Sequence, residues 1–355
     1  MRIMHMLNHT RPSNGHVHVA VDLACVQARM GHSISVVSGG GAFDSLFEAY
    51  GVKHIVIDQE RRLLNLMKAT CRLRSAVAAF SPDIIHAHMM TSAGLAFLLR
   101  PFMKFKLVTT VHNEFEKVAI IMGVGDRVIA VSKAVAASME RRGVHKSRLR
   151  VVLNGTIGSP RLSAETPPTK DIDRPAITFV GGLHPRKGVD DLITAFKTVC
   201  ARVPSAFLYL VGDGPCRSVY EGLASRTGFG ERIRFCGSQA DPRPYLLGSD
   251  LFVLASHAEP GALVLPEARE AGCAIIATSV DGIPEMLDGG KAGILVPPRR
   301  PDLLAGAIME VLGDKALLAE MRARSRSNLD HFTVDRAAKE YISVYRSLLD
   351  GSHRP

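Results

Sequence analysis

The sequence predicts two α/β domains, each built on a parallel sheet. Short, continuously apolar, β-branched runs alternate with helical stretches along most of the 355 residues, and strands that are apolar on both sides are typical of sheets covered by helices on both faces. The alternation is broken once, over residues 155–168, by a segment rich in Gly, Ser and Pro that is typical of a linker. We therefore expect two doubly wound domains facing a cleft, with ligands at the carboxyl ends of the strands.

The first half of the chain supplies seven strands and at least three helices. Each strand is predicted where a short apolar run lies between polar or turn-forming residues. The predicted strands are Arg2–Leu7, Ser33–Val37, His54–Ile57, Asp83–His86, Leu107–Val111, Arg127–Val131 and Arg150–Leu153. The predicted helices between them include His16–Met30, Arg61–Phe80 and Lys133–Arg141.

The second half repeats the same alternation after the linker. Its six predicted strands are Ala176–Val180, Phe207–Val211, Ile233–Cys236, Leu251–Leu254, Ala274–Ala277 and Gly293–Val296. From Pro301 onward the pattern is helical and the chain ends without another strand.

The composition points to a reducing compartment and gives no sign of a membrane span. The six cysteines form no C-x-x-C pair and no cluster with histidines, which argues against a disulfide framework or a structural zinc site. The apolar run at the start of the chain is too short for a signal-peptide core. No stretch approaches the roughly 18 uninterrupted apolar residues of a transmembrane helix. We expect a cytoplasmic protein.

Net positive charge is confined to the first half. Residues 1–170 hold 22 Lys and Arg against 11 Asp and Glu, a balance of +11, whereas residues 171–355 hold 22 against 23. Eight of these cations lie between Arg61 and Lys106, where Asp83 is the one acid. Such a patch fits nucleic acid, an anionic membrane surface or an anionic acceptor, and it also fits an ordinary solvated helix face.

The predicted helix Arg61–Phe80 is amphipathic. At about 100° per residue, Arg61, Lys68 and Arg72 share one face. The opposite face carries Leu63, Leu66, Leu73 and Val77. We expect this apolar face to pack on the sheet, so that any contact with a membrane is made by the basic face.

The segment from His257 to Ala268 has the chemistry of a nucleotide-sugar pocket. It follows the predicted strand Leu251–Leu254, contains a glycine turn at Gly261 and opens into a helix. A helix start presents backbone N–H groups that suit an anion, and the carboxylates of Glu259 and Glu267 can accept hydrogen bonds from sugar hydroxyls. Ordinary surface or capping carboxylates are the alternative.

Two other motifs carry less weight. Gly212-Asp213-Gly214 begins like a dinucleotide fingerprint, but Arg217 stands where the third glycine belongs. Asp171-Ile172-Asp173 has the spacing of a metal-binding D-x-D motif, but it lies in the linker and no predicted strand directly precedes it. We expect no metal site and no cofactor.

The ordered set of motifs resembles the family 4 retaining glycosyltransferases of GT-B fold, over nearly the whole chain. The first half carries Asn14-Gly15, His112 at the end of a strand, Val131-Ser132-Lys133 and Leu153-Asn154-Gly155. The second half carries Gly181-Gly182-Leu183-His184-Pro185-Arg186-Lys187-Gly188, Gly212-Asp213-Gly214-Pro215, Phe235-Cys236-Gly237 and the Glu259/Glu267 pair.

The resemblance implies a role for each of these positions. Lys187 and Arg186 would neutralise the donor diphosphate, with Glu259 on the donor sugar and His112 near the reacting centre. Glu267 would hold the ribose, and backbone near Cys236 would read the nucleobase. The remaining donor-binding positions are Asn14, Gly15, Gly181, Gly182, Gly261, Ala262 and Leu263.

Two departures from the family pattern bear on donor choice. The family often has Arg where Gly182 stands, which leaves Arg186 to replace that cation. Pro260 and Ala262 stand in a loop that usually reads Glu-Gly-Phe-Gly, and Pro260 removes one N–H donor. The leading hypothesis is metal-independent transfer of a sugar from a nucleotide donor, which we expect to be UDP-linked. A nucleotide-sugar epimerase and a catalytically weak nucleotide-sugar-binding protein are the alternatives.

The resemblance also implies the domain plan and the partners. Residues 1–160 would form a Rossmann-like acceptor domain and residues 173–331 a Rossmann-like donor domain, with the helix of residues 332–355 returning to the first domain. The partners would be a nucleotide sugar and a glycan or lipid-linked acceptor in cell-envelope or polysaccharide synthesis, not nucleic acid. The basic first half adds an anionic surface, the inner face of the plasma membrane, as an expected docking place.

Overall fold

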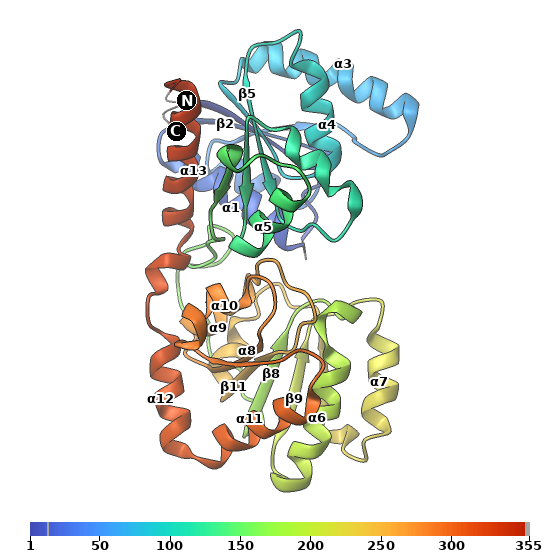
Figure 1. Cartoon of the computed structure of the whole chain (residues 1–355), viewed down its shortest axis with the longest axis vertical. Helices are drawn as coiled ribbons and strands as arrows, with labels where there is room; N and C mark the ends of the chain where they lie inside the picture. Colours follow the sequence, from blue (N-terminus) through green and yellow to red (C-terminus); the bar gives the residue numbers. More distant parts are fainter. Residues whose placement is uncertain (13, 352–355) are drawn as a thin grey trace. The chain divides into compact units, whose positions relative to one another are not determined.

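The chain divides into two compact units, and the computed structural model describes residues 1–12 and 14–351. The first unit combines Met1–Leu162 with the chain from Phe332 onward, and the second is Ser163–His331. Each unit contains one parallel sheet flanked by helices (Figure 1). The prediction of two doubly wound parallel-sheet domains is confirmed.

The first sheet has seven strands in the order β3-β2-β1-β4-β5-β6-β7, and every neighbouring pair is parallel. Each predicted strand of this half is present, with ends that differ by one or two residues. The strands are β1 (Arg2–Met6), β2 (Ser33–Ser38), β3 (Lys53–Val56), β4 (Ile84–Ala87), β5 (Lys106–Val111), β6 (Arg127–Ala130) and β7 (Leu149–Val151).

Helices bury both faces of this sheet, in two separate apolar clusters. One cluster joins β1, β2 and β4 to α1, α2 and α13, with Val17, Phe47 and Tyr341 fully buried. The other joins the opposite face to α3, α4 and α5 through Leu73, Leu95 and Met139. The helices are α1 (Gly15–Arg29), α2 (Asp44–Ala49), α3 (Leu63–Phe80), α4 (Met90–Leu99), α5 (Lys133–Arg141) and α13 (Val334–Leu349), with 3-10 segments at Lys117–Val124 and Lys146–Arg148.

The last helix, α13, belongs to the first unit. Tyr341 and Tyr345 are buried against the first sheet, and Asp335 accepts a hydrogen bond from Arg29 at 2.7 Å. A short bridge between Ile157 and Thr333 holds the chain at the point where it re-enters this unit. Figure 1 shows α13 running along the first unit, close to the N-terminus.

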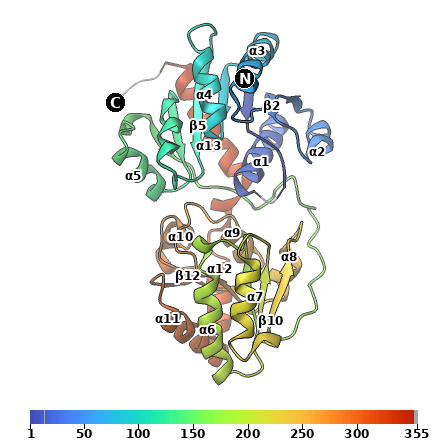
Figure 2. The same cartoon turned by 90° about the vertical axis from the view of Figure 1, so that its right-hand side faces the viewer.

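The second sheet has six parallel strands in the order β10-β9-β8-β11-β12-β13. Figure 2 shows β10 and β12 together with the helices of this unit. Helices α6, α7 and α11 pack together, and α8, α9 and α12 form a second group. The strands are β8 (Ala176–Val180), β9 (Phe207–Val211), β10 (Ile233–Gly237), β11 (Leu251–Leu254), β12 (Ala274–Thr278) and β13 (Ile294–Val296). The helices are α6 (Val189–Arg202), α7 (Arg217–Ser225), α8 (Arg243–Gly248), α9 (Val264–Glu270), α10 (Ile283–Met286), α11 (Pro301–Gly313) and α12 (Lys315–Ser325).

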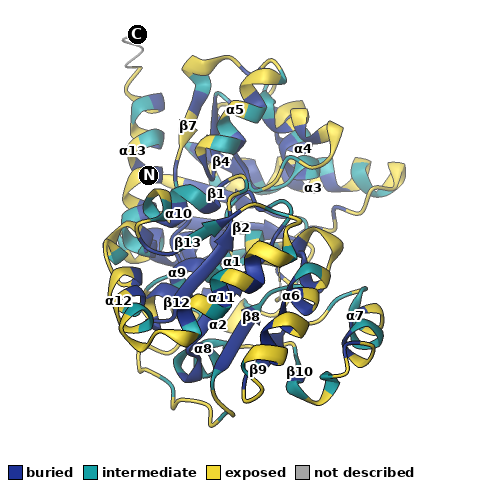
Figure 3. Cartoon of the chain, turned by 60° about the horizontal axis from the view of Figure 1, so that its bottom comes forward, coloured by how far each residue is buried: buried dark blue, intermediate teal, exposed yellow. Residues whose placement is uncertain are grey.

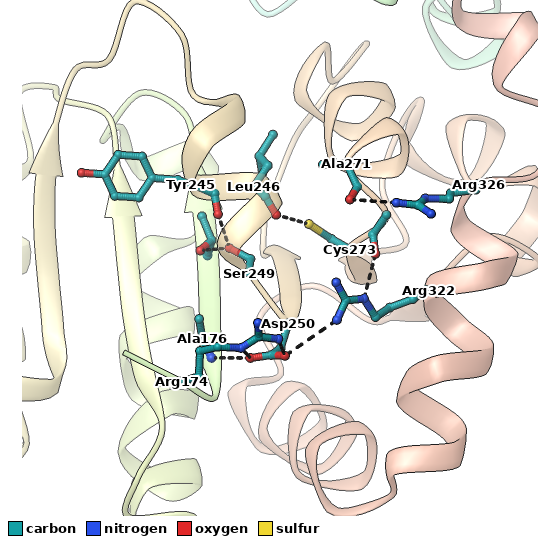
Figure 4. Close-up of polar contacts among 12 residues, drawn as sticks. Arg174, Ala176, Tyr245, Leu246, Ser249, Asp250, Ala271, Cys273, Arg322 and Arg326 are labelled. Atoms are coloured by element: carbon teal, nitrogen blue, oxygen red, sulfur yellow. Dashed lines mark hydrogen bonds and ion pairs between the residues drawn. The ribbon is translucent and has the colours of Figure 1, made fainter. Parts of the chain in front are cut away.

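A polar network holds the amino ends of β8 and β11 (Figure 4). The carboxylate of Asp250 accepts hydrogen bonds from Arg174 Nε at 3.0 Å and from the backbone N–H of Ala176 at 2.9 Å. Arg322 of α12 lies 3.9 Å from the same carboxylate and donates to the carbonyl of Gly272 at 3.0 Å. Because these contacts lie at the end of the sheet opposite the strand termini that bind ligands, we assign them to stability.

Helix α3 packs only partly as predicted. Leu73 and Val77 are buried on the first sheet, but Leu63 is 78% exposed and its neighbours Leu64 and Met67 are 74% and 60% exposed. The expectation that Leu63 packs on the sheet is therefore wrong, because the first turns of α3 make few contacts with it. Figure 3 shows exposed turns along this helix. No helix in the described part of the chain is long and apolar enough to span a bilayer.

Candidate active site

The strongest candidate site lies where the order of the second sheet reverses. Strands β8 and β11 are neighbours, while the strands that follow each of them lie on opposite sides, and such a reversal point is where open parallel sheets usually bind ligands. The turn after β8 carries Lys187 and the turn after β11 carries Glu259. Sheet topology thus brings together two residues that are 72 positions apart in the chain.

Backbone contacts hold these two turns against each other. The carbonyl of Arg186 accepts hydrogen bonds from the N–H groups of His257 at 2.7 Å and Ala258 at 3.4 Å. Gly188 ends the first turn in the left-handed region at φ 60°. A Cβ at this position would lie 2.0 Å from the carbonyl oxygen of Ala255, so only glycine allows the approach.

Lys187 and Glu259 form a buried ion pair. Lys187 is 9% exposed and Glu259 is 5% exposed, and the ammonium donates directly to the carboxylate. Arg186 Nη1 lies 3.8 Å from the same carboxylate, and Ser256 Oγ donates to it at 3.3 Å. The backbone N–H of Glu259 donates to Asp281 at 2.6 Å. Two cations and one carboxylate are therefore held at a strand-end turn, which suits a ligand carrying both an anion and hydroxyl groups.

The other predicted residues of the second unit lie in the turns after β8 and β11, on α9 and on β10. Gly181 and Gly182 leave β8 directly before the Lys187 turn, and Gly181 donates to Val211 of β9 at 2.9 Å. The turn through Gly261, Ala262 and Leu263 leads into α9, which carries the half-buried Glu267. Cys236 lies on β10, separated from β8 by β9, and its carbonyl accepts a hydrogen bond from Gln239 at 2.9 Å.

The remaining three predicted residues belong to the first unit. Asn14 precedes α1, where its carbonyl accepts from Val17 at 3.0 Å and from His18 at 3.1 Å, and Gly15 is the first residue of that helix. His112 follows β5 directly. The predicted site residues therefore form two sets, one at the strand ends of each sheet.

Four polar residues beside His112 were missed in the sequence. His5 on β1, His86 and His88 at the end of β4, and Gln27 on α1 are all buried. His88 Nδ1 lies 3.1 Å from His112 Nε2, and His88 Nε2 lies 3.0 Å from His5 Nδ1. The spacing of His86 and His88 is the one signal in the sequence, because residues two apart lie on one side of a strand. His5 is the register partner of His86 in the sheet, which the sequence alone does not show.

Burial keeps these imidazoles neutral. Burial lowers the pKa of His5 to about 4 and the pKa of His112 to about 3, and it lowers the pKa values of His86 and His88 well below the usual 6.5. His16, whose ring centre is 6.0 Å from that of His112, has a pKa of about 4 for the same reason. His112 is therefore a neutral hydrogen-bonding group at physiological pH.

Two sets of side chains among the described residues have the spacing of metal ligands. One set is His5, His86 and His88, and the other is Asp190, Asp191 and His257. In the second set His257 Nε2 lies 2.7 Å from Asp191 Oδ2. In the first set every ring nitrogen takes part in a hydrogen bond, which leaves no lone pair free for a metal.

Comparisons with known proteins match both halves of the chain to family models. Residues 13–156 match the family described as Glycosyltransferase Family 4, and residues 164–328 match the family described as Glycosyl transferases group 1. The chain belongs to glycosyltransferase family 4. The two matched regions of this glycosyltransferase follow one another, one in each structural unit.

Curated relatives of this glycosyltransferase are also glycosyltransferases. It is 30% identical over 208 residues to the lipopolysaccharide core biosynthesis glycosyltransferase LpsE of Rhizobium meliloti, a match that covers 57% of this chain and 59% of LpsE. It is 27% identical over 305 residues to the D-inositol 3-phosphate glycosyltransferase of Jonesia denitrificans, covering 74% of this chain and 71% of that protein.

Solved structures support the GT-B fold of this glycosyltransferase. Anabaena Alr3699/HepE in complex with UDP and glucose has a TM-score of 0.83 at 21% identity and covers 98% of this chain and all of that chain. WaaG, a glycosyltransferase involved in lipopolysaccharide biosynthesis, has a TM-score of 0.77 at 15% identity and covers 97% of this chain and 99% of that chain. At these identities the likeness concerns the fold.

Proposed function

We propose that this family 4 glycosyltransferase transfers a sugar from a UDP-linked donor to a glycan or lipid-linked acceptor in cell-envelope polysaccharide or lipopolysaccharide synthesis. The observation that carries the proposal is the buried pair of Lys187 and Glu259 at the reversal point of the second sheet. The choice of UDP is supported by Alr3699/HepE, which is described in complexes with UDP and UDP-glucose. The choice of acceptor class is supported by LpsE.

The residues have distinct roles in this proposal. Lys187 and Arg186 stabilise the diphosphate as negative charge develops on it during departure. Glu259 is released from part of its pairing with Lys187 when the diphosphate binds and accepts hydrogen bonds from hydroxyls of the donor sugar. Glu267 holds the ribose, and His112 contacts the donor sugar. Supporting backbone contacts come from Asn14, Gly15, Gly181, Gly182, Cys236, Gly261, Ala262 and Leu263.

We propose that transfer retains the configuration of the sugar. The bond between the anomeric carbon and the diphosphate oxygen breaks through an oxocarbenium-like transition state, and the acceptor hydroxyl forms its new bond on the same face. The proton of that hydroxyl passes to the departing diphosphate oxygen. Lys187 and Arg186 act throughout on the leaving group, and exclusion of water protects the donor from hydrolysis.

A panel of nucleotide sugars tests the function against its two rivals. Slow hydrolysis of one donor, accelerated into transfer when a glycan or lipid-linked acceptor is added, supports the transferase. Isomerisation of the donor without acceptor supports an epimerase of the same architecture, and binding without turnover supports a nucleotide-sugar-binding protein. Either of the last two results overturns the proposal.

Chelation is expected to leave the activity intact. Lys187 and Arg186 supply the positive charge that a divalent ion would bring to the leaving group. Asp171 and Asp173, the one D-x-D of the chain, lie before β8 with no strand leading into them. Initial rates should therefore be equal in EDTA and in added Mg²⁺. A rate lost in EDTA and restored by Mg²⁺ or Mn²⁺ would contradict metal independence.

The start of α3 and the loop before it form the proposed membrane-docking surface. Exposed cations at Arg61, Arg62 and Lys68 interleave with the exposed apolar side chains of Leu63, Leu64 and Met67. Each cation near an anionic bilayer contributes about 1 kcal/mol, and exposed apolar side chains add burial in the interface. The charge term favours the anionic inner face of the plasma membrane.

Vesicle binding tests this surface. We expect binding to vesicles that contain anionic lipid, little binding to neutral vesicles, and release by high salt, because attraction decays over roughly 8 Å at physiological ionic strength. Replacing Arg61, Lys68 and Arg72 with Glu should abolish binding and leave donor hydrolysis unchanged. The matched control replaces three exposed cations of the second unit, Lys197, Arg202 and Lys315, and should bind normally. Equal binding to neutral and anionic vesicles would exclude an electrostatic mechanism.

A further inference from the structure

A buried chain of hydrogen bonds leads from α1 to His112. Gln27 Oε1 lies 2.9 Å from His5 Nε2, His5 Nδ1 lies 3.0 Å from His88 Nε2, and His88 Nδ1 lies 3.1 Å from His112 Nε2. Four side chains from α1 and from the adjacent strands β1, β4 and β5 are thereby connected in series. Gln27, His5 and His88 are buried in the core of the first unit.

The tautomers of the histidines in this hydrogen-bonded chain depend on one another. Each neutral imidazole has one N–H and one lone pair, and each hydrogen bond needs one of each. If one end of the chain is a donor, every following ring must present its N–H in the same direction. The chain therefore has two overall directions, and the group at its inner end selects between them.

Gln27 selects the direction, because its carbonyl oxygen can only accept. His5 must then carry its proton on Nε2, so His5 Nδ1 accepts from His88 Nε2 and His88 Nδ1 accepts from His112 Nε2. This leaves a lone pair on His112 Nδ1, for which the described residues provide no hydrogen-bond partner.

The Gln27 amide presents its oxygen to His5. Gln27 Oε1 is the atom that lies 2.9 Å from His5 Nε2, and the amide nitrogen is buried without a hydrogen-bond partner among the described residues. Burial raises the pKa of the Tyr345 phenol well above its usual value, and an interaction with Gln27 lowers it in part. Tyr345 in turn lies 2.7 Å from His86 Nδ1.

We propose that Gln27, His5 and His88 are positioning residues that fix His112 as its Nε2–H tautomer, so that His112 Nδ1 accepts a hydrogen bond from a sugar hydroxyl of the donor. The ligand class follows from the lone pair, which attracts an O–H group and repels an ionised phosphate oxygen. A group that holds its proton this weakly is a poor base at neutral pH, so the role is recognition of the sugar and not proton removal. The inference rests on the proposed function for the identity of the ligand alone.

Nitrogen-15 NMR of the full-length protein tests the tautomer directly. We expect His112 to show a protonated Nε2 and an unprotonated Nδ1, identified by loss of the signals in His112→Asn. Gln27→Met removes the acceptor at the inner end and should give His112 a mixture of tautomers. Gln27→Glu keeps an acceptor oxygen and should restore the single tautomer. A protonated Nδ1 in the unmodified protein would overturn the proposal, and so would stoichiometric zinc on His5, His86 and His88.

Binding measurements separate this inference from the function. With UDP-glucose and UDP as probes, Gln27→Met should weaken UDP-glucose about tenfold, the loss of one hydrogen bond of about 1.4 kcal/mol, and leave UDP unchanged. Gln59→Met is the matched control, because Gln59 is equally buried but bonds to Leu7 and Ser92 and not to a histidine. Equal weakening of both probes by Gln27→Met would overturn the sugar role. If the expected tautomer of His112 is confirmed but no donor is turned over, the proposed function is refuted and the proposed positioning of His112 is not.

Discussion

Replacing Lys187 with Met should lower kcat by roughly 100-fold or more, the usual cost of removing one group that stabilises charge in a transition state. The ammonium of Lys187 lies at the strand-end turn where a leaving diphosphate would accumulate charge, with Arg186 as the neighbouring cation. Because most of that charge develops during departure, kcat should fall more than donor affinity. Steady-state kinetics with the donor found in the nucleotide-sugar panel measure both quantities.

The buried pair makes this substitution a test of stability as well. Removing Lys187 leaves the Glu259 carboxylate buried with Arg186 and Ser256 as its remaining partners, and breaking a buried pair typically costs 3–5 kcal/mol. The double variant Lys187→Met/Glu259→Gln removes the uncompensated charge and should recover most of the lost stability. It should not recover activity, which separates the catalytic effect from the folding effect.

Lys197→Met is the matched control for charge. Lys197 is an exposed cation on α6, the helix that follows the Lys187 turn, and it has no part in the proposed site. This variant should keep kcat within about twofold, as expected for a surface change. A normal kcat in the double variant would remove Lys187 from the mechanism.

The sheets were predictable from the sequence because their strands are buried on both faces. A strand such as Leu251–Leu254 needs apolar residues at every position, so a continuous apolar run predicts it without knowledge of its neighbours, and the structure places β11 at those residues. Strand ends are less certain, since the last residue of β10 is Gly237 and not the predicted Cys236.

The start of α3 was not predictable from periodicity. The pattern of Leu63, Leu66, Leu73 and Val77 assumes that one apolar face meets the sheet along the whole helix. The structure buries Leu73 and Val77 and leaves Leu63 exposed, because the extent of the underlying sheet is a tertiary property that local spacing does not contain.

The candidate site likewise combines residues that motifs identify with contacts that only the tertiary structure shows. Lys187 and Glu259 could be named from family motifs, but their direct pairing joins strand ends 72 residues apart in sequence. The contact between His5 and His88 spans 83 residues. Isolated histidines carry no motif, so this hydrogen-bonded chain becomes visible only when the order of strands β1, β4 and β5 is known.

The first unit should lose most of its stability when the pH falls from about 6.5 toward 4. Burial lowers the pKa values of His5 and His16 to about 4 and of His18 and His112 to about 3. In the unfolded chain these groups return to about 6.5 and bind protons that the folded unit excludes, so stability falls as the pH falls through this window. At pH 5 each fully buried histidine lowers the free energy of unfolding by on the order of 2 kcal/mol. Because a domain is typically stable by about 5–15 kcal/mol, several such losses are enough to unfold it. Burial raises the pKa of Asp22, so this one group makes the folded unit more stable as the pH falls.

Hydrogen exchange read peptide by peptide between pH 7.5 and 4.5, with the intrinsic rates corrected for pH, distinguishes the two units. Protection in β1, β4 and β5 should disappear near pH 5, while β8 and β11 keep theirs, because the second unit has no fully buried histidine among its described residues. The variant His5→Gln removes one group that binds a proton only in the unfolded chain. The stability of the first unit should then depend less steeply on pH, even if the variant is less stable at pH 7.5. The matched control is His331→Gln, which changes a histidine outside the buried set and should leave the slope unchanged. Equal loss of protection in both units, or a first unit that stays protected at pH 4.5, would contradict the assignment of neutral, proton-excluding histidines to its core.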